Sequence, residues 1–190
     1  MKILVFFGKP GAGKGTQADL LKAHYNLVHI STGDLFRYNI KNKTELGTLA
    51  QSYIDAGDLV PDQVTIDMLE AEVEKNPNAA GFIFDGFPRT QAQAEALDAF
   101  LAGRKLSVSA TIALEAEDDV LVERLLKRGE TSGRTDDQDE AKIRNRFAEY
   151  NEKTAPLRSY YEGQGKFHSV NGIGTLEEIS QRLTQLIDGL

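Results

Sequence analysis

The stretch that decides the fold is ILVFFGKPGAGKGT, residues 3–16. Ile3 to Phe7 form a continuous apolar run without alternation, which is typical of a strand buried on both faces of a parallel sheet. A glycine-rich loop and then a helical pattern follow at once. Glycines let backbone N–H groups point at phosphate oxygens, the helix N-terminus adds partial positive charge, and Lys14 adds a mobile cation. The segment therefore predicts a phosphate-binding loop.

The residue after the lysine differs from the general phosphate-loop pattern, which has Ser or Thr there, whereas this chain has Gly15. Here Gly15 intervenes before Thr16, so no hydroxyl at position 15 can bind a magnesium ion. We expect any such metal to be held through waters and phosphate oxygens. The alternative is a glycine-rich turn with a solvated lysine, which the agreement of strand, spacing and Lys14 disfavours.

The rest of the chain alternates short apolar runs with helical patterns. Strands are expected at residues 3–7, 27–30, 81–85, 108–114 and 167–170. Helices are expected at residues 16–24, 31–42, 44–56, 61–76, 90–101, 118–128, 139–161 (with a break at Pro156) and 176–190. This alternation predicts a single α/β domain with a five-stranded parallel sheet flanked by helices.

Two segments fall outside the expected core of residues 1–30, 61–128 and 139–190. Residues 31–60 are helical without a strand and are predicted to be an inserted flap, with Ser31 or Thr32 as a helix cap and Gly57 as a left-handed cap. Residues 129–138 are predicted to be a short polar loop, with Asp118 and Asp119 capping the helix before it.

Composition excludes several function classes. The chain has 190 residues and a net charge of −7, which argues against general nucleic-acid binding because that needs a basic face. A small nucleotide responds to local charge instead. No stretch approaches the roughly 20 apolar residues that cross a bilayer, so no membrane partner is expected. The absence of cysteine excludes disulfides and thiolate metal sites, and a cytoplasmic location is expected.

The loop Gly8–Thr16, of the form G-x-P-G-x-G-K-G-T, resembles that of nucleoside monophosphate kinases. Further segments match in order along nearly the whole chain: STGDLFR (31–37), GDLV (57–60), DGFPRT (85–90), SGRTDD (132–137) and TAP (154–156). The chain is similar to the adenylate kinases of the short-lid type within that family. The resemblance implies a P-loop kinase fold, with residues 31–60 as the NMP-binding flap and 129–138 as the lid.

The resemblance also implies the activity, which is reversible, direct in-line phosphoryl transfer between ATP and AMP, giving two ADP. The cofactor would be Mg²⁺, the partners ATP, AMP and ADP, the enzyme a monomer, and its role the adenine nucleotide balance. The short stretch from Arg128 to Arg134 and the missing cysteines leave no place for a structural zinc. Two alternatives stay open: a UMP/CMP kinase of the same family, and a catalytically inactive nucleotide-binding protein.

Arginine and aspartate carry the predicted catalytic work, because phosphoryl transfer depends on positioning and charge stabilisation. Asp85 ends a strand where open α/β sheets bind ligands, and its carboxylate would anchor the waters of Mg²⁺, unless it is a helix cap or structural turn. By resemblance, the catalytic residues are Lys14, Asp85, Arg89, Arg128, Arg134 and Arg146. Arg144 remains an alternative to Arg146. Between Asp136-Asp137 and the triplet Arg144-Asn145-Arg146, the chain carries one more residue than many relatives.

The two nucleotide sites follow from the same resemblance. ATP would contact Gly11, Ala12, Gly13, Lys14, Gly15, Thr16, Arg124, Arg128 and a carbonyl near Gly174. AMP would contact Thr32, Arg37, Asp58, Leu59, Val60, Gly86, Phe87, Pro88, Arg89, Gln93, Arg134 and Arg146. Thr32 and Gln93 would read the adenine, since an amide can accept from its amino group and donate to a ring nitrogen. Relatives acting on UMP and CMP tend to carry Ala and Asn there.

Other side chains receive supporting roles or none. Asp136 and Asp137 are expected to hold the lid arginines by ion pairing and to cap the next helix. His24, His29 and His168 lie outside the phosphate motifs and are not expected to take part in catalysis. Tyr160 and Tyr161 are expected to pack a helix.

Overall fold

The computed structural model describes residues 1–56 and 60–190. Its sheet has five strands in the order β2-β3-β1-β4-β5, and every pair is parallel. The strands are β1 (Lys2–Phe7), β2 (Val28–Ser31), β3 (Gly81–Asp85), β4 (Ala110–Glu115) and β5 (Phe167–Asn171). The expected parallel α/β sheet is confirmed, and each expected strand lies within a few residues of its predicted place.

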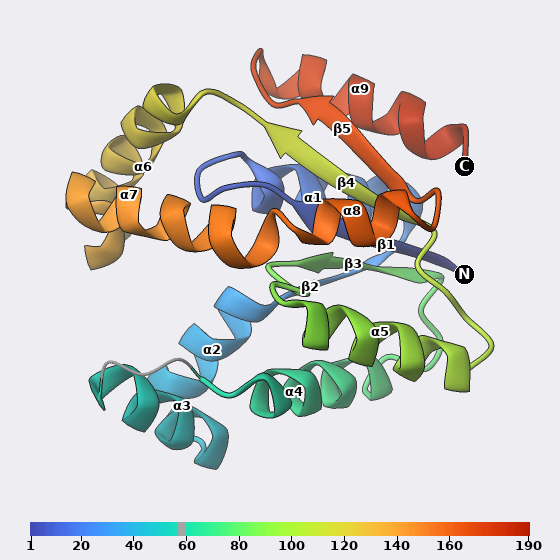
Figure 1. Cartoon of the computed structure of the whole chain (residues 1–190), viewed down its shortest axis with the longest axis horizontal. Helices are drawn as coiled ribbons and strands as arrows, with labels where there is room; N and C mark the ends of the chain where they lie inside the picture. The colour runs from blue at the N-terminus through green and yellow to red at the C-terminus, as the bar shows by residue number, and fades with distance from the viewer. Residues whose placement is uncertain (57–59) are drawn as a thin grey trace.

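Helices connect these strands (Figure 1). They are α1 (Lys14–Tyr25), α2 (Thr32–Lys41), α3 (Glu45–Ala56), α4 (Asp62–Glu74), α5 (Gln91–Gly103), α6 (Asp118–Ser132), α7 (Glu140–Glu149), α8 (Leu157–Glu162) and α9 (Leu176–Asp188). A 3₁₀ turn (Thr135–Asp137) precedes α7, and a π-helical turn (Tyr150–Thr154) follows it. No helix in the described ranges combines the length and apolarity that a membrane span requires.

Strand alternation divides the core into two layers. Leu4 and Phe6 of β1 belong to one buried cluster, in which α1, α6, α7 and α9 pack. Ile3, Val5 and Phe7 belong to the other, with α4, α5 and α8. Successive side chains of β1 point to opposite faces of the sheet, and helices cover both faces. Every residue of the run is therefore buried, which explains why it is apolar without a break. Helices α2 and α3 pack against each other beside the sheet (Figure 1).

Several boundaries differ from the sequence expectations. The segment 129–138 is not a loop, because α6 continues through Ser132 and ends at Gly133, which has a φ of 67°. Glu117 is the N-cap of α6, so Asp118 and Asp119 lie in its first turn. Their charge favours that helix end without a capping hydrogen bond.

The long helix expected at residues 139–161 is interrupted before Pro156, at the π-helical turn. The first helix begins at Lys14 rather than Thr16, and Ser31 caps α2 by accepting from Asp34 N. The predicted cap at Gly57 lies outside the described residues.

Candidate active site

A cavity of about 940 Å³ opens at the carboxyl ends of β1 and β3, beside the loops that follow these strands. The predicted residues that line it are Gly11, Ala12, Gly13, Lys14, Gly15, Thr16, Thr32, Arg37, Val60, Asp85, Gly86, Pro88, Arg89, Gln93, Arg124, Arg128, Arg134, Arg146 and Gly174. Phe87 is 1% exposed and packs in the core instead. Asp58 and Leu59 lie outside the described residues. One cavity thus collects side chains from segments far apart in the sequence.

The glycine-rich loop leaves no room for side chains at two of its glycines. A Cβ on Gly8 would lie 2.6 Å from Leu114 O, and one on Gly11 would lie 2.9 Å from a Leu125 side-chain carbon. Both have positive φ, at 139° and 84°, which side chains disfavour. The loop leads directly into the N-terminus of α1, whose first N–H groups lack partners within the helix. This is the geometry of an anion site.

Lys14 lies folded onto that loop. Its Nζ donates to Gly8 O at 2.8 Å and to Lys9 O at 3.2 Å. Burial lowers the pKa of Lys14 to about 8; nearby Asp85 opposes this shift, and the charges of Arg89, Arg146 and Arg128 add to it. So many cations around one ammonium are compatible with a ligand that carries several negative charges.

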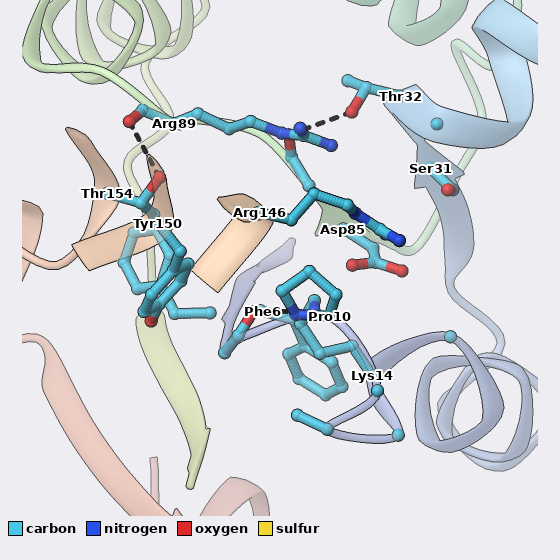
Figure 2. A pocket seen from close by; sticks show the side chains of 18 of the residues that line it. Phe6, Pro10, Lys14, Ser31, Thr32, Asp85, Arg89, Arg146, Tyr150 and Thr154 are labelled. Atoms are coloured by element: carbon cyan, nitrogen blue, oxygen red, sulfur yellow. Dashed lines mark hydrogen bonds between the residues drawn. The ribbon is translucent and has the colours of Figure 1, made fainter. Parts of the chain in front are cut away.

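Asp85 stands at the end of β3, with its side chain 13% exposed (Figure 2). Burial alone would raise the pKa of Asp85, but its contact with His29 and the charges of Lys14 and Arg89 hold the pKa below its usual range. The carboxylate is therefore ionised at neutral pH beside the phosphate loop. The alternative role as a helix cap has no support, since α5 is capped by Thr90.

His29 is a residue that the sequence analysis set aside. Its Nε2 lies 3.8 Å from Asp85 Oδ2, and its Nδ1 lies 3.4 Å from Asp19 Oδ1. Burial would lower the pKa of His29, but the two carboxylates raise it above its usual value. Only the pairing of β2 with β3, which sets His29 beside Ile83, reveals this proximity, so no motif could have indicated it.

Arg89 is held by a network that joins three segments. Its Nε donates to Gly86 O at 2.7 Å, and Thr32 Oγ1 donates to the same carbonyl at 2.9 Å. Thr154 Oγ1 of the π-helical turn donates to Arg89 O at 3.0 Å (Figure 2). Thr32 thus connects α2 to the loop after β3. The N-cap of α2, for which Ser31 and Thr32 were the two candidates, is Ser31.

Gln93 is 5% exposed, and both ends of its amide are bonded within the protein. Its Oε1 accepts from Arg89 N at 2.8 Å, and its Nε2 donates to Asp62 Oδ1 at 2.7 Å. Each amide group has capacity for one further hydrogen bond. Asp62, the first residue of α4, therefore fixes which way the amide points.

Arg128 and Arg146 meet at a buried carboxylate. Asp137 has a fully buried side chain and accepts from Arg128 Nε at 2.6 Å and from Arg146 Nη1 at 2.8 Å. Burial would raise the pKa of Asp137, but these two guanidinium groups hold it below its usual range. Arg146 also pairs with Asp136 at 2.9 Å. The ion-pairing role expected of both aspartates is therefore present.

The capping role expected of these aspartates is wrong. Asp139 caps α7 by accepting from Ala141 N and Lys142 N. Asp136 and Asp137 lie in the 3₁₀ turn instead, because the fold uses their carboxylates for the arginines.

Arg144 and Arg146, the two candidates for a phosphate ligand, lie on different sides of α7. Arg144 pairs with Glu140 at 2.8 Å and Asp119 at 3.2 Å on the exposed side of α7. Arg146 lines the cavity and faces Asp85 in Figure 2. Two residues along a helix rotate a side chain by about 200°, so only one of the two can face the site.

The family model for adenylate kinase matches residues 6–166 of the chain. The adenylate kinase of Flavobacterium psychrophilum is 68% identical over 187 residues, which cover 98% of each chain. Those of Flavobacterium johnsoniae and Bacteroides fragilis are 64% and 46% identical, again with 98% of each chain covered. The chain belongs to the adenylate kinase family. It is a phosphotransferase, and the family to which it belongs binds ATP, AMP and ADP.

The adenylate kinase fold also brings residues to the cavity that no sequence motif indicated. Besides Asp62, these include Gln17, Asp19, Glu149, Tyr150 and Lys153. Burial raises the pKa of Tyr150 to about 12, with Glu115 adding to the shift and a hydrogen bond with the Gly8 backbone opposing it. The π-helical turn therefore contacts both the phosphate loop, through Tyr150, and Arg89, through Thr154.

Proposed function

We propose that this chain transfers a phosphoryl group reversibly between ATP and AMP, giving two ADP, and so balances the adenine nucleotides as a monomer in the cytoplasm. The observation that carries the proposal is the convergence of Lys14, Arg89, Arg128, Arg134 and Arg146 on one cavity beside an ionised Asp85. Such a set can bring two polyanions end to end.

The two nucleotides would occupy opposite ends of the cavity. ATP would lie with its phosphates on Gly11–Thr16 and its base between Arg124 and Gly174. Arg124 is positioned for this by donating to Gly172 O at 3.1 Å. AMP would lie under the flap of residues 31–60, with Arg37 and Arg89 on its phosphate.

The base of AMP would meet Thr32, Gln93 and Val60. The fixed amide of Gln93 supports adenine, because its remaining donor and acceptor would be left unpaired by a mismatched base.

A magnesium ion fits the residues present at Asp85. The carboxylate is ionised, and a Cβ on Gly15 would lie 3.6 Å from Asp85 Oδ2, so this oxygen lies against the phosphate loop. Oxygen ligands with several waters are what Mg²⁺ prefers. Asp85 would hold the waters of the ion, and Mg²⁺ bound to ATP would neutralise phosphate charge. Within the described ranges, no cluster of three or more His, Cys, Asp or Glu side chains forms a protein-only metal site.

The transfer would be in line, without a covalent intermediate. An oxygen of the AMP phosphate forms a bond to the γ-phosphorus of ATP as the bond from that phosphorus to the β–γ bridging oxygen breaks. Arg37 and Arg89 would hold the attacking phosphate, which supplies much of the orientation advantage. Lys14, Arg128, Arg134 and Arg146 would stabilise charge on the transferring group.

Two flanking segments would exclude water during transfer: the flap of residues 31–60 and the lid of residues 129–138. Arg134 of the lid lies 3.8 Å from Asp34 of the flap, so the two segments meet across the cavity mouth. Closure would protect ATP from hydrolysis.

The test is ADP formation from ATP and Mg²⁺ with AMP, UMP, CMP and GMP in parallel. We expect AMP to be preferred by at least about a hundredfold in kcat/KM, the size expected when buried polar groups lose their partners. A preference for UMP or CMP would contradict the roles of Thr32 and Gln93. A folded protein that binds ATP but forms no ADP would contradict the proposed transfer itself.

The pH dependence follows from Lys14. We expect kcat/KM for ATP to fall as the pH rises through about 8, because the free enzyme then loses the ammonium charge. Bound ATP places negative charge beside Lys14 and raises its pKa, so kcat at saturating ATP should fall only at higher pH. A kcat/KM that stays level between about pH 7 and pH 10 would contradict this assignment.

A further inference from the structure

The loop between β5 and α9, residues 171–175, lines the cavity through Gly174. Hydrogen bonds fix its backbone at both ends. Ile173 N donates to Asn171 Oδ1 at 2.9 Å, and Thr175 with Glu178 forms a capping box at the start of α9. The donor base is proposed to bind at this loop, so its conformation bears on ATP recognition.

Arg182 spans the loop from the next turns of α9. A single guanidinium nitrogen, Nη1, donates to Asn171 O at 2.9 Å and to Ile173 O at 2.7 Å. Charged donors make the stronger hydrogen bonds to carbonyls, and one nitrogen shared between two carbonyls fixes their separation. Arg182 therefore clamps the loop on either side of Gly172.

Gly174 allows this clamp to form. Its φ is 133°, and a Cβ there would lie 2.5 Å from Glu178 Oε2 and 3.3 Å from Arg182 Nη2. Both side chains thus lie close against the bare Cα of Gly174. A side chain at this position would push them away.

The clamp leaves one carbonyl of the loop for a ligand. Arg182 occupies those of Asn171 and Ile173, Arg124 occupies that of Gly172, and Ile179 N occupies that of Thr175. Across residues 171–175, all of them described, the Gly174 carbonyl alone accepts no hydrogen bond from the described part of the chain. It is an acceptor without a donor beside it.

We propose that Arg182 is a positioning residue for the donor nucleotide: it holds the loop so that the Gly174 carbonyl accepts from the amino group of the ATP base. The inference rests on the proposed function. A guanine base presents a keto oxygen instead of an amino group, and two acceptors repel. Arg182 therefore contributes both to ATP affinity and to the preference for ATP over GTP.

The experiment compares Arg182→Gln and Arg182→Lys with the wild-type chain. Calorimetry without Mg²⁺ or a second nucleotide gives Kd for ATP, GTP and AMP. We expect Arg182→Gln to raise Kd for ATP about three- to tenfold, the size of one or two net hydrogen bonds, with Kd for AMP within about twofold. Kd for GTP should change less than Kd for ATP. Arg182→Lys should fall between the two, since an ammonium keeps the charge and can still reach a carbonyl.

Arg158→Gln is the matched control. Arg158 is a half-exposed arginine of α8 that pairs with Glu162 at 2.7 Å, away from the cavity lining. Its loss should leave all three Kd values unchanged. Equal weakening of ATP, GTP and AMP in Arg182→Gln would show a general structural effect and overturn the inference, and so would an unchanged Kd for ATP.

The binding comparison stands apart from turnover. A wild-type chain that binds ATP but yields no ADP would overturn the proposed function alone. A fully active wild-type chain whose Arg182→Gln variant binds ATP normally would overturn this inference alone.

Discussion

Replacing Lys14 with methionine is expected to lower kcat for ADP formation by about a thousandfold while the protein stays folded. Methionine keeps most of the length and an apolar, unbranched stem but removes the charge that would stabilise the transferring phosphoryl group. The loop loses the hydrogen bonds of Lys14 to Gly8 O and Lys9 O, yet Ala12 N still donates to Lys9 O at 3.2 Å. Steady-state kinetics and a thermal unfolding curve together measure the two effects.

Lys22→Met is the control for Lys14→Met. Lys22 lies on the same helix and pairs with Asp19 at 2.7 Å, but its side chain is 46% exposed and does not line the cavity. An exposed pair of this kind contributes little, so Lys22→Met should keep kcat within about twofold. Turnover in Lys14→Met equal to that of Lys22→Met would remove Lys14 from the mechanism.

The second large effect is expected at Arg146. Arg146→Met should lower kcat by about a hundredfold or more, because the variant removes a cation that lines the cavity and, in the proposed mechanism, would stabilise the transferring group. Asp137 would keep its hydrogen bond from Arg128 at 2.6 Å, so its buried carboxylate is not left without a partner. We therefore expect a larger loss of activity than of thermal stability.

Arg144→Met is the matched variant for this test. Arg144 lies two residues earlier on α7 and has exposed partners only, Glu140 and Asp119. Its removal should leave kcat within about twofold, since exposed pairs contribute little. A larger loss of kcat in Arg144→Met than in Arg146→Met would show that Arg144, and not Arg146, is the residue of α7 that binds phosphate.

Local patterns were sufficient for the parts of the site that lie on one segment. The loop at Gly8–Thr16 and the strand that ends at Asp85 each carry their geometry in a few neighbouring residues, because glycine content and apolar runs act over short distances. The sheet and its parallel strands followed from such segments, whereas the site arginines were implied by the resemblance to nucleoside monophosphate kinases. The lid did not, since no short-range pattern shows that α6 continues to Ser132.

By itself the sequence determined which side chains carry charge and where the chain must turn, because both depend on residue type and near neighbours. Tertiary structure alone decided which distant groups meet, such as His29 beside Asp85 and Gln93 bonded to Asp62. These contacts depend on strand order and helix packing, which no local spacing contains. The physical reason is that hydrogen bonds and charge interactions act over a few ångströms in space, whatever the separation along the chain.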